Sequence, residues 1–250
     1  MNFPEVPRVF YRKTPLHEVE ARAFFAPDLR IETEKPASVQ QEIKDSFPVY
    51  KRINESTDHS SPDIVHEFKS EDGEWTIHLR KDQVSISTSN YYSWDQFTVK
   101  LQQVVTTIAD VYNVKHYLLV ALKYTDVIDR ETLGFSKETA WTKLIQPYIL
   151  GELSAPDIKE PEVMGSMKKF VLKDKENNFH LGVEHGLAEA EGKSETAYLI
   201  DFTFFQKQKL EVANVLSIFG VFNGKARNFF RWCITQELHD KMDPQKTDHR

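Results

Sequence analysis

Hydrophobic and polar residues alternate along several short segments, a pattern typical of β-strands with one face buried. Between Leu16 and Phe25 the small apolar residues lie on one side and the charged residues Glu18, Glu20 and Arg22 on the other. We predict four further strands in the first half, at 49–54, 63–70, 74–80 and 84–88. Asp72-Gly73 is a hairpin turn signal between two of them. The polar segment 54–62 is interpreted as a mobile loop.

The second half begins with a longer apolar run, from His116 to Val127. Because its centre is apolar on both faces, we expect either a central strand covered on both sides or a strand at a subunit contact. Three more strands are predicted at 167–172, 179–185 and 196–205. The stretch 188–195 contains acidic and small residues and is interpreted as a loop.

Apolar residues at helical spacing predict five helical regions. The first covers 37–47, the second starts after Ser93 as N-cap and ends at Asn113, and the third covers 137–150, with Pro147 shortening its end. The fourth covers 210–219 and should be interrupted by Gly220 and Gly224, and the last should run from near Lys225 to Met242. Residues 1–14 should run extended over the surface, and 245–250 should be disordered.

The order of these elements nearly repeats, which predicts an α+β fold built from two β-α-β(3-4)-α units. The first unit is 1–114, the second is 115–243, and 244–250 is a tail. By analogy with the TATA-binding-protein architecture, the units should form one curved antiparallel sheet with helices packed on one face. The uncovered face would then be a surface for binding a partner.

Composition limits the classes of function. The chain has 250 residues, of which 40% are hydrophobic and 28% charged, so it is too apolar for a disordered protein. Its net charge of −6 disfavours nucleic acid as a partner. No apolar run approaches the ~18 residues that cross a membrane, so we expect a cytoplasmic protein. The single cysteine, Cys233, excludes an intrachain disulfide, and we expect it to be buried.

Known catalytic motifs do not fit the chain. Pro62, Asp63, Glu67 and Lys69 superficially supply a PD…ExK nuclease site, but both carboxylates would lie on one short strand, too far apart to share a metal. His180 and Glu184 are separated on one strand in the same way. Neither a Gly-x-Ser-x-Gly elbow nor a Gly-rich phosphate loop is present. We therefore predict no catalytic residue, metal ligand or cofactor.

Two clusters are candidate binding sites. Tyr91, Tyr92 and Trp94 precede a predicted helix and could stack on a ligand or partner, or instead staple that helix to the sheet. The other cluster follows the predicted central strand and consists of Asp126, Asp129 and Arg130, which could form a small polar site or a salt-bridged strand end. Lys123 and Tyr124, on the strand itself, are further binding candidates.

Short segments in a fixed order resemble a sporadically distributed family of uncharacterised bacterial and archaeal proteins. These segments are Pro15–Val19, Pro36–Gln40, Phe47–Tyr50, Tyr91–Phe97, Leu122–Tyr124, Trp141–Ile145 with Pro147, Ile200–Phe202, and Leu238–His239 with Met242 and Pro244. The family's strand after the long helix tends to read Gly-Leu-Arg-Tyr-x-Asn, and here Lys123 replaces the arginine. Lysine keeps the charge but loses the bidentate fork. The resemblance implies no activity, but patchy distribution is typical of mobile defence and toxin–antitoxin loci.

Taken together, the sequence favours a non-enzymatic interaction protein. We expect it to bind a protein, a peptide or a second copy of itself, through the uncovered sheet face or the Tyr91–Trp94 segment. The alternative is a hydrolase-type enzyme whose site is assembled from dispersed residues, such as Lys123, Tyr124, Asp126 and Asp201. A nucleic-acid binder is a third reading, on the saddle analogy alone.

Overall fold

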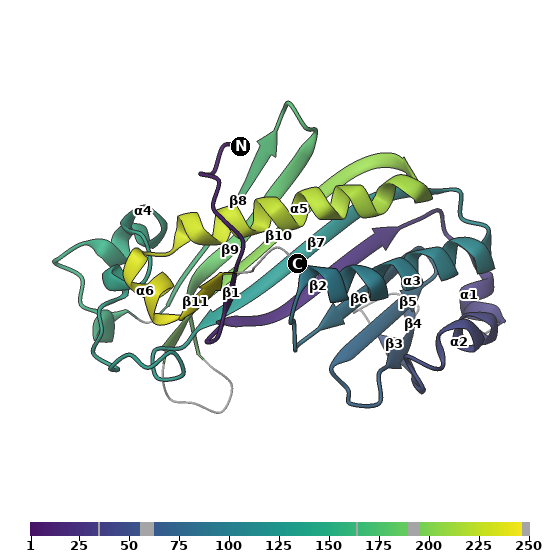
Figure 1. The fold of residues 1–250 in the computed structure, drawn as a ribbon, viewed down its shortest axis with the longest axis horizontal. Coiled ribbons are helices and arrows are strands. Elements are labelled where there is room, and N and C mark those ends of the chain that lie inside the picture. The colour runs from purple at the N-terminus through teal and green to yellow at the C-terminus, as the bar shows by residue number, and fades with distance from the viewer. Residues whose placement is uncertain (35, 56–62, 164, 190–195, 247–250) are drawn as a thin grey trace.

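The computed structural model describes residues 1–34, 36–55, 63–163, 165–189 and 196–246, and Figure 1 shows its fold. Most of the two predicted loops at 54–62 and 188–195 lies outside these residues. Among the described residues, no helix is long and apolar enough to cross a membrane. The fold is α+β, as predicted.

One nine-stranded antiparallel sheet forms the centre of the molecule, in the order β3-β4-β5-β6-β2-β7-β10-β9-β8. Its strands are β2 (Leu16–Phe24), β3 (Val49–Glu55), β4 (Asp63–Lys69), β5 (Trp75–Arg80), β6 (Gln83–Thr88), β7 (His116–Ile128), β8 (Ser166–Asp174), β9 (Phe179–Glu189) and β10 (Thr196–Glu211). Strands β2 and β7 pair at the centre, so the two predicted halves share a single sheet.

Helices cover one face of the sheet (Figure 1). The two long ones are α3 (Trp94–Tyr112) and α5 (Val212–Cys233). The amide of Gln96 donates to Ser93 Oγ, and Asn113 ends α3 in the left-handed conformation, so the predicted caps are confirmed. The short helices are α1 (Arg30–Thr33), α2 (Ala37–Ile43), α4 (Pro147–Leu150) and α6 (Gln236–Lys241), with 3-10 turns η1 (Trp141–Lys143), η2 (Gly151–Ser154) and η3 (Glu160–Glu162).

Two helix predictions were wrong. The region 137–150 is not one helix, because Pro147 cannot lie inside a helix and instead starts α4, after the separate turn η1. Conversely, Gly220 and Gly224 do not interrupt α5, which is continuous. An interior glycine costs a helix only about 1 kcal/mol, and the packing of Phe219, Phe222 and Phe229 in the core outweighs that.

Alternation along β7 shows how the sheet divides into two faces. Val120, Leu122, Tyr124 and Asp126 are buried on the helix side, among the aromatic residues of β10 and α5. The opposite face is largely polar and paired. It carries the ion pair between Lys123 Nζ and Asp201 Oδ2 at 2.8 Å, and similar pairs on β2 and on β8–β9. The central position predicted for β7 is confirmed, but the expectation that it is covered on both sides was wrong, because helices pack on one face of the sheet only.

A strap crosses the helix side of the molecule. We use this name for residues 6–14, which pass in front of α5 and over the sheet (Figure 1). The strap contains β1 (Val9–Tyr11), which pairs with β11 (Pro244–Lys246) in a separate two-stranded sheet. The prediction of an extended segment at 1–14 is therefore confirmed. The tail prediction was wrong for Pro244–Lys246, because strand pairing orders them; 247–250 lie outside the described residues.

Candidate functional site

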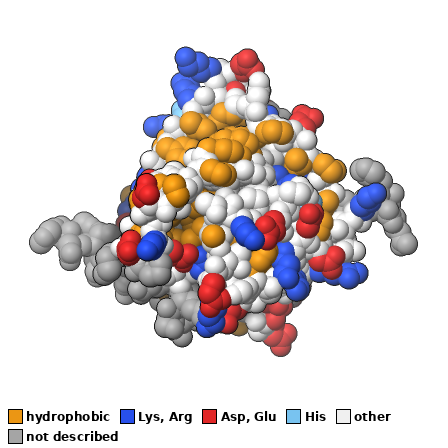
Figure 2. Space-filling view, turned by 90° about the vertical axis from the view of Figure 1, so that its left-hand side faces the viewer, with side chains coloured by type: hydrophobic (Ala, Val, Ile, Leu, Met, Phe, Trp, Pro, Cys, Tyr) orange, Lys and Arg blue, Asp and Glu red, His pale blue; other side chains and the backbone are white. Residues whose placement is uncertain are grey.

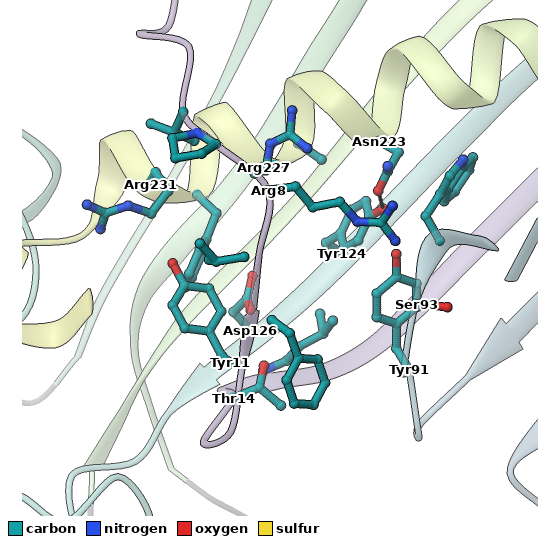
Figure 3. Close-up of a pocket in the computed structure, with 18 of the residues that line it drawn as sticks. Arg8, Tyr11, Thr14, Tyr91, Ser93, Tyr124, Asp126, Asn223, Arg227 and Arg231 are labelled. Atoms are coloured by element: carbon teal, nitrogen blue, oxygen red, sulfur yellow. Dashed lines mark hydrogen bonds between the residues drawn. The ribbon is translucent and has the colours of Figure 1, made fainter. Parts of the chain in front are cut away.

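A cavity of about 360 Å³ lies beneath the strap. Its floor is the helix side of β7 and β10, and its walls are α5 and the Tyr91–Trp94 segment before α3. Figure 3 shows the strap running across the front of the cavity, with side chains from all of these elements turned toward it. We call this space the strap cavity. Its volume lies at the lower end of the range of small-molecule sites in proteins.

Aromatic rings form much of the cavity wall. Tyr124 stacks on Phe202 at 5.6 Å between centroids, and its edge meets Tyr91 at 6.3 Å. Phe10 of the strap packs against Tyr92 at 5.4 Å, which closes one side. These contacts hold the rings in fixed positions, so the cavity offers preformed aromatic surface.

Tyrosine hydroxyls in the wall are held by named partners. The hydroxyl of Tyr124 donates to Asn223 Oδ1 at 2.8 Å, which joins the central strand to α5. Tyr11 Oη and His239 Nδ1 lie 2.7 Å apart. Burial raises the pKa of Tyr11 to about 12, and burial, with Arg231 nearby, lowers the pKa of His239. At neutral pH this contact therefore joins a protonated phenol to a neutral imidazole, and the imidazole tautomer decides which of the two donates.

Asp126 is a buried carboxyl group on the cavity floor, only 4% exposed. Burial, and to a smaller degree the charge of Asp201 on the neighbouring strand, raise its pKa to about 8. Asp126 is therefore mostly protonated at neutral pH and can donate a hydrogen bond from the floor. A carboxyl group shifted in this way inside a cavity is typical of functional sites.

Three arginines reach the cavity. Arg8 extends from the strap toward Asn223, Tyr124 and Tyr91 (Figure 3), and its Nη2 lies 3.0 Å from Asp95 Oδ2. Arg227 and Arg231 come from α5. Each has one buried nitrogen without a hydrogen-bond partner, Nε of Arg227 and Nη1 of Arg231. Among the described residues, no carboxylate lies within ion-pair distance of either of these two.

Five of the seven predicted site residues line this one cavity: Tyr91, Tyr92, Trp94, Tyr124 and Asp126. Lys123 does not, because neighbouring residues of a strand point to opposite faces, and its ammonium pairs with Asp201 behind the sheet.

Arg130 does not line the strap cavity either. It is buried between the ring of Trp141, 3.8 Å from the guanidinium carbon, and the carboxylate of Glu160, to which its Nη1 donates at 2.8 Å. This is a salt-bridged strand end, the alternative considered from sequence.

The sequence analysis missed the remaining cavity residues. Arg8 and Tyr11 lie in a segment predicted only to be extended. Asn223, Arg227 and Arg231 recur every four residues on α5, which places them on one helix face. This polar stripe was the signal in the sequence that could have identified these residues. It was missed because we expected the helix to break at Gly224.

The geometry can bind a ligand without any metal. No group of three or more metal-ligating side chains occurs among the residues that the structure describes. The cavity instead combines aromatic surface, a buried carboxyl and two guanidinium groups that have no ion pair within the described part of the chain. These features define the chain as an α+β protein with a strap-covered cavity. No protein-family model and no curated protein matches it.

Proposed function

We propose that this chain is a non-enzymatic binding protein and that the strap cavity is its ligand site. The observation that carries the proposal is the pair of buried, unpartnered nitrogens of Arg227 and Arg231 beside a preformed aromatic wall. A buried donor without a partner costs about 1–3 kcal/mol. A ligand that accepts hydrogen bonds from these nitrogens would remove that cost.

The hydrolase alternative loses support from the placement of its residues. Tyr124 and Asp126 are on the cavity side of the sheet, while Lys123 and Asp201 pair with each other on the other side. These four side chains cannot meet at one substrate.

The expected partner was a protein, a peptide or a second copy, on the uncovered sheet face. Ion pairs occupy much of that face, which favours solvent there over an apolar partner. Because the strap covers the cavity, we propose a small molecule as the ligand instead.

Self-association remains a second proposal, supported by one patch. Figure 2 shows hydrophobic side chains gathered on the upper part of the end of the molecule formed by α4 and α6. Tyr148 of α4 is exposed at this end. A dimer through this patch should dissociate when Tyr148→Glu is introduced, as measured by sedimentation velocity. A wild-type protein that sediments as a monomer at all concentrations would refute it.

Three further proposals concern the origin and the biological role of the chain. The duplication is supported by the sheet order, in which β2 and β7 pair and the strands of each half follow outward on either side. The resemblance to the sporadically distributed family, and a role as an accessory of mobile defence or toxin–antitoxin loci, rest on the sequence segments alone.

The cavity can be tested with a neutral aromatic fluorophore, N-phenyl-1-naphthylamine. We expect saturable binding to the wild-type protein at one site. Ala226 lines the cavity and is buried, so Ala226→Leu should fill it and weaken binding by about tenfold or more. Val221→Leu, at an exposed position of the same helix, is the matched control. If the Ala226→Leu protein binds the fluorophore as tightly as the wild type does, the strap cavity is not the binding site.

A further inference from the structure

We infer that the ligand of the strap cavity is a small planar aromatic acid, whose ring lies against Tyr91 and Tyr124 and whose carboxylate or phosphate binds Arg227. This inference rests on the proposed function and specifies the chemistry of the ligand. Three independent features of the cavity lead to it.

The first feature is the arrangement of the rings. Tyr91, Tyr124 and Phe202 form one continuous aromatic contact, and Phe230 of α5 lines the same space. Offset stacking and edge-to-face contacts favour a flat ring over a branched aliphatic group. The ligand portion enclosed by these residues is therefore best matched by a planar aromatic system.

The second feature is the polar stripe of α5. Asn223 is already used by the hydroxyl of Tyr124, whereas Arg227, one turn further, has a buried Nε without a partner. Figure 3 shows Arg227 on the cavity side of α5, near the side chain of Arg8 that reaches in from the strap. A planar guanidinium fork matches a carboxylate or a phosphate.

The third feature is the sign of the charge. Arg227 and Arg231 line the cavity together with Arg8, which pairs with Asp95, and among the described lining residues the only carboxyl group is Asp126. Burial keeps Asp126 mostly protonated at neutral pH, and the pKa of His239 is lowered. The cavity is therefore positive. An ammonium ligand would be repelled, although an aromatic cage by itself would suit one.

A pair of fluorophores with the same ring system tests the acid group. 8-Anilinonaphthalene-1-sulfonate is N-phenyl-1-naphthylamine with one added sulfonate. We expect the wild-type protein to bind the sulfonate about tenfold or more tightly than the neutral compound, because an ionic hydrogen bond is gained. Competition with 1-naphthoate and with 1-naphthyl phosphate then distinguishes a carboxylate ligand from a phosphate ligand.

Matched variants assign this preference to Arg227. Arg227→Gln should abolish the tenfold preference while leaving binding of the neutral compound within about twofold. Lys225→Gln removes the same charge two residues away, at a position that does not line the cavity, and should keep the preference.

The outcomes separate the two proposals. If both fluorophores bind equally well, or if Arg227→Gln keeps the preference, the acid ligand is excluded and the binding cavity stands. If the Ala226→Leu variant binds both as well as the wild type does, the cavity itself is excluded.

Discussion

The hydroxyl of Tyr124 donates a hydrogen bond to the side-chain oxygen of Asn223 over 2.8 Å, and this contact joins the central strand β7 to the middle of α5. Ninety-nine residues separate the two partners in sequence. Because burial raises the pKa of Tyr124 well above its usual value, the donor stays protonated across the physiological range. This contact fixes the distance between the floor and one wall of the strap cavity.

Removal of this hydrogen bond should destabilise the fold. Tyr124→Phe keeps the ring in its stack on Phe202 but leaves Asn223 Oδ1 without its donor. We expect a loss of about 1–2 kcal/mol in the free energy of unfolding, measured by urea denaturation. Tyr92→Phe, at a 63% exposed ring, should change it by less than about 0.5 kcal/mol. Equal stability of the Tyr124→Phe protein and the wild type would contradict the structural role.

Protonation of Asp126 should make stability depend on pH. Its pKa of about 8 in the folded protein exceeds the usual 3.8, so the folded state keeps a proton that the unfolded chain releases. The contribution of Asp126 to stability is therefore fully present below about pH 4, falls as pH rises toward about 8, and does not change further above that.

Asp126→Asn cannot titrate and should remove this contribution. Between pH 5 and about 8 the wild type should lose a few kcal/mol of unfolding free energy that the variant keeps. The difference between the two proteins, measured by urea denaturation at each pH, should therefore shift in favour of the variant by that amount. The other groups around the cavity, Tyr11, His239 and Arg231, are the same in both proteins, so the difference isolates Asp126. A constant difference across this range would mean that Asp126 is charged in the fold.

Ligand entry should require the strap to move. Phe10 and Gln245 are directly opposite in the β1–β11 pair, so Phe10→Cys with Gln245→Cys allows a disulfide that locks the strap to β11. The oxidised protein should bind N-phenyl-1-naphthylamine more slowly by about tenfold or more in stopped-flow measurements.

Reduction of this disulfide should restore the rate. The native Cys233 is buried and should not interfere. Identical association rates in the two redox states would show that ligands enter without separation of β1 from β11.

Gly220 offers a test of the continuous helix. A methyl group added there meets no atom within 4 Å, so Gly220→Ala should stabilise the protein by about 0.5–1 kcal/mol. Gly186→Ala is the opposite case, because its φ of +155° favours glycine and the added methyl would collide with the carbonyl of Ser166. Thermal unfolding of both variants measures the contrast. A lower melting temperature for Gly220→Ala would mean that α5 is broken there.

Arg130 should act on stability alone. Arg130→Lys keeps the charge but loses the bidentate contact with Glu160 and the stacking on Trp141. We expect a loss of about 1–3 kcal/mol in the free energy of unfolding and unchanged affinity for N-phenyl-1-naphthylamine. Weaker binding by a fully folded Arg130→Lys protein would contradict this prediction and show that Arg130 contributes to the ligand site.

Sequence patterns predicted the sheet well because each strand buries one face. Val19, Ala21 and Ala23 are all buried on the same side of β2, and the alternation of β5 around Ile77 does the same. The patterns failed where tertiary contacts decide the structure. β1 has three residues and pairs across more than 230 positions with β11, a relationship that no local periodicity records.

Only part of the candidate site could be predicted from the sequence, because tertiary contacts bring its residues together. Tyr91, Trp94 and Asp126 were identified by residue type, because aromatic and buried acidic groups are rare enough to attract attention. Lys123 was wrongly grouped with Tyr124 and Asp126, although strand alternation already places its side chain on the opposite face from theirs. The cavity itself joins side chains from the strap, from strands β2, β7 and β10 and from helices α3, α5 and α6, which only the folded chain brings together.

The pairing of β1 with β11, which holds the strap over the cavity, has a consequence for biosynthesis. Val9–Tyr11 cannot pair with Pro244–Lys246 until the residues of β11 have also left the ribosome. Closing so large a loop also carries an entropic penalty that local elements do not. A ligand therefore cannot template the folding of the segments made before β11, and it becomes enclosed only after β11 has been synthesised.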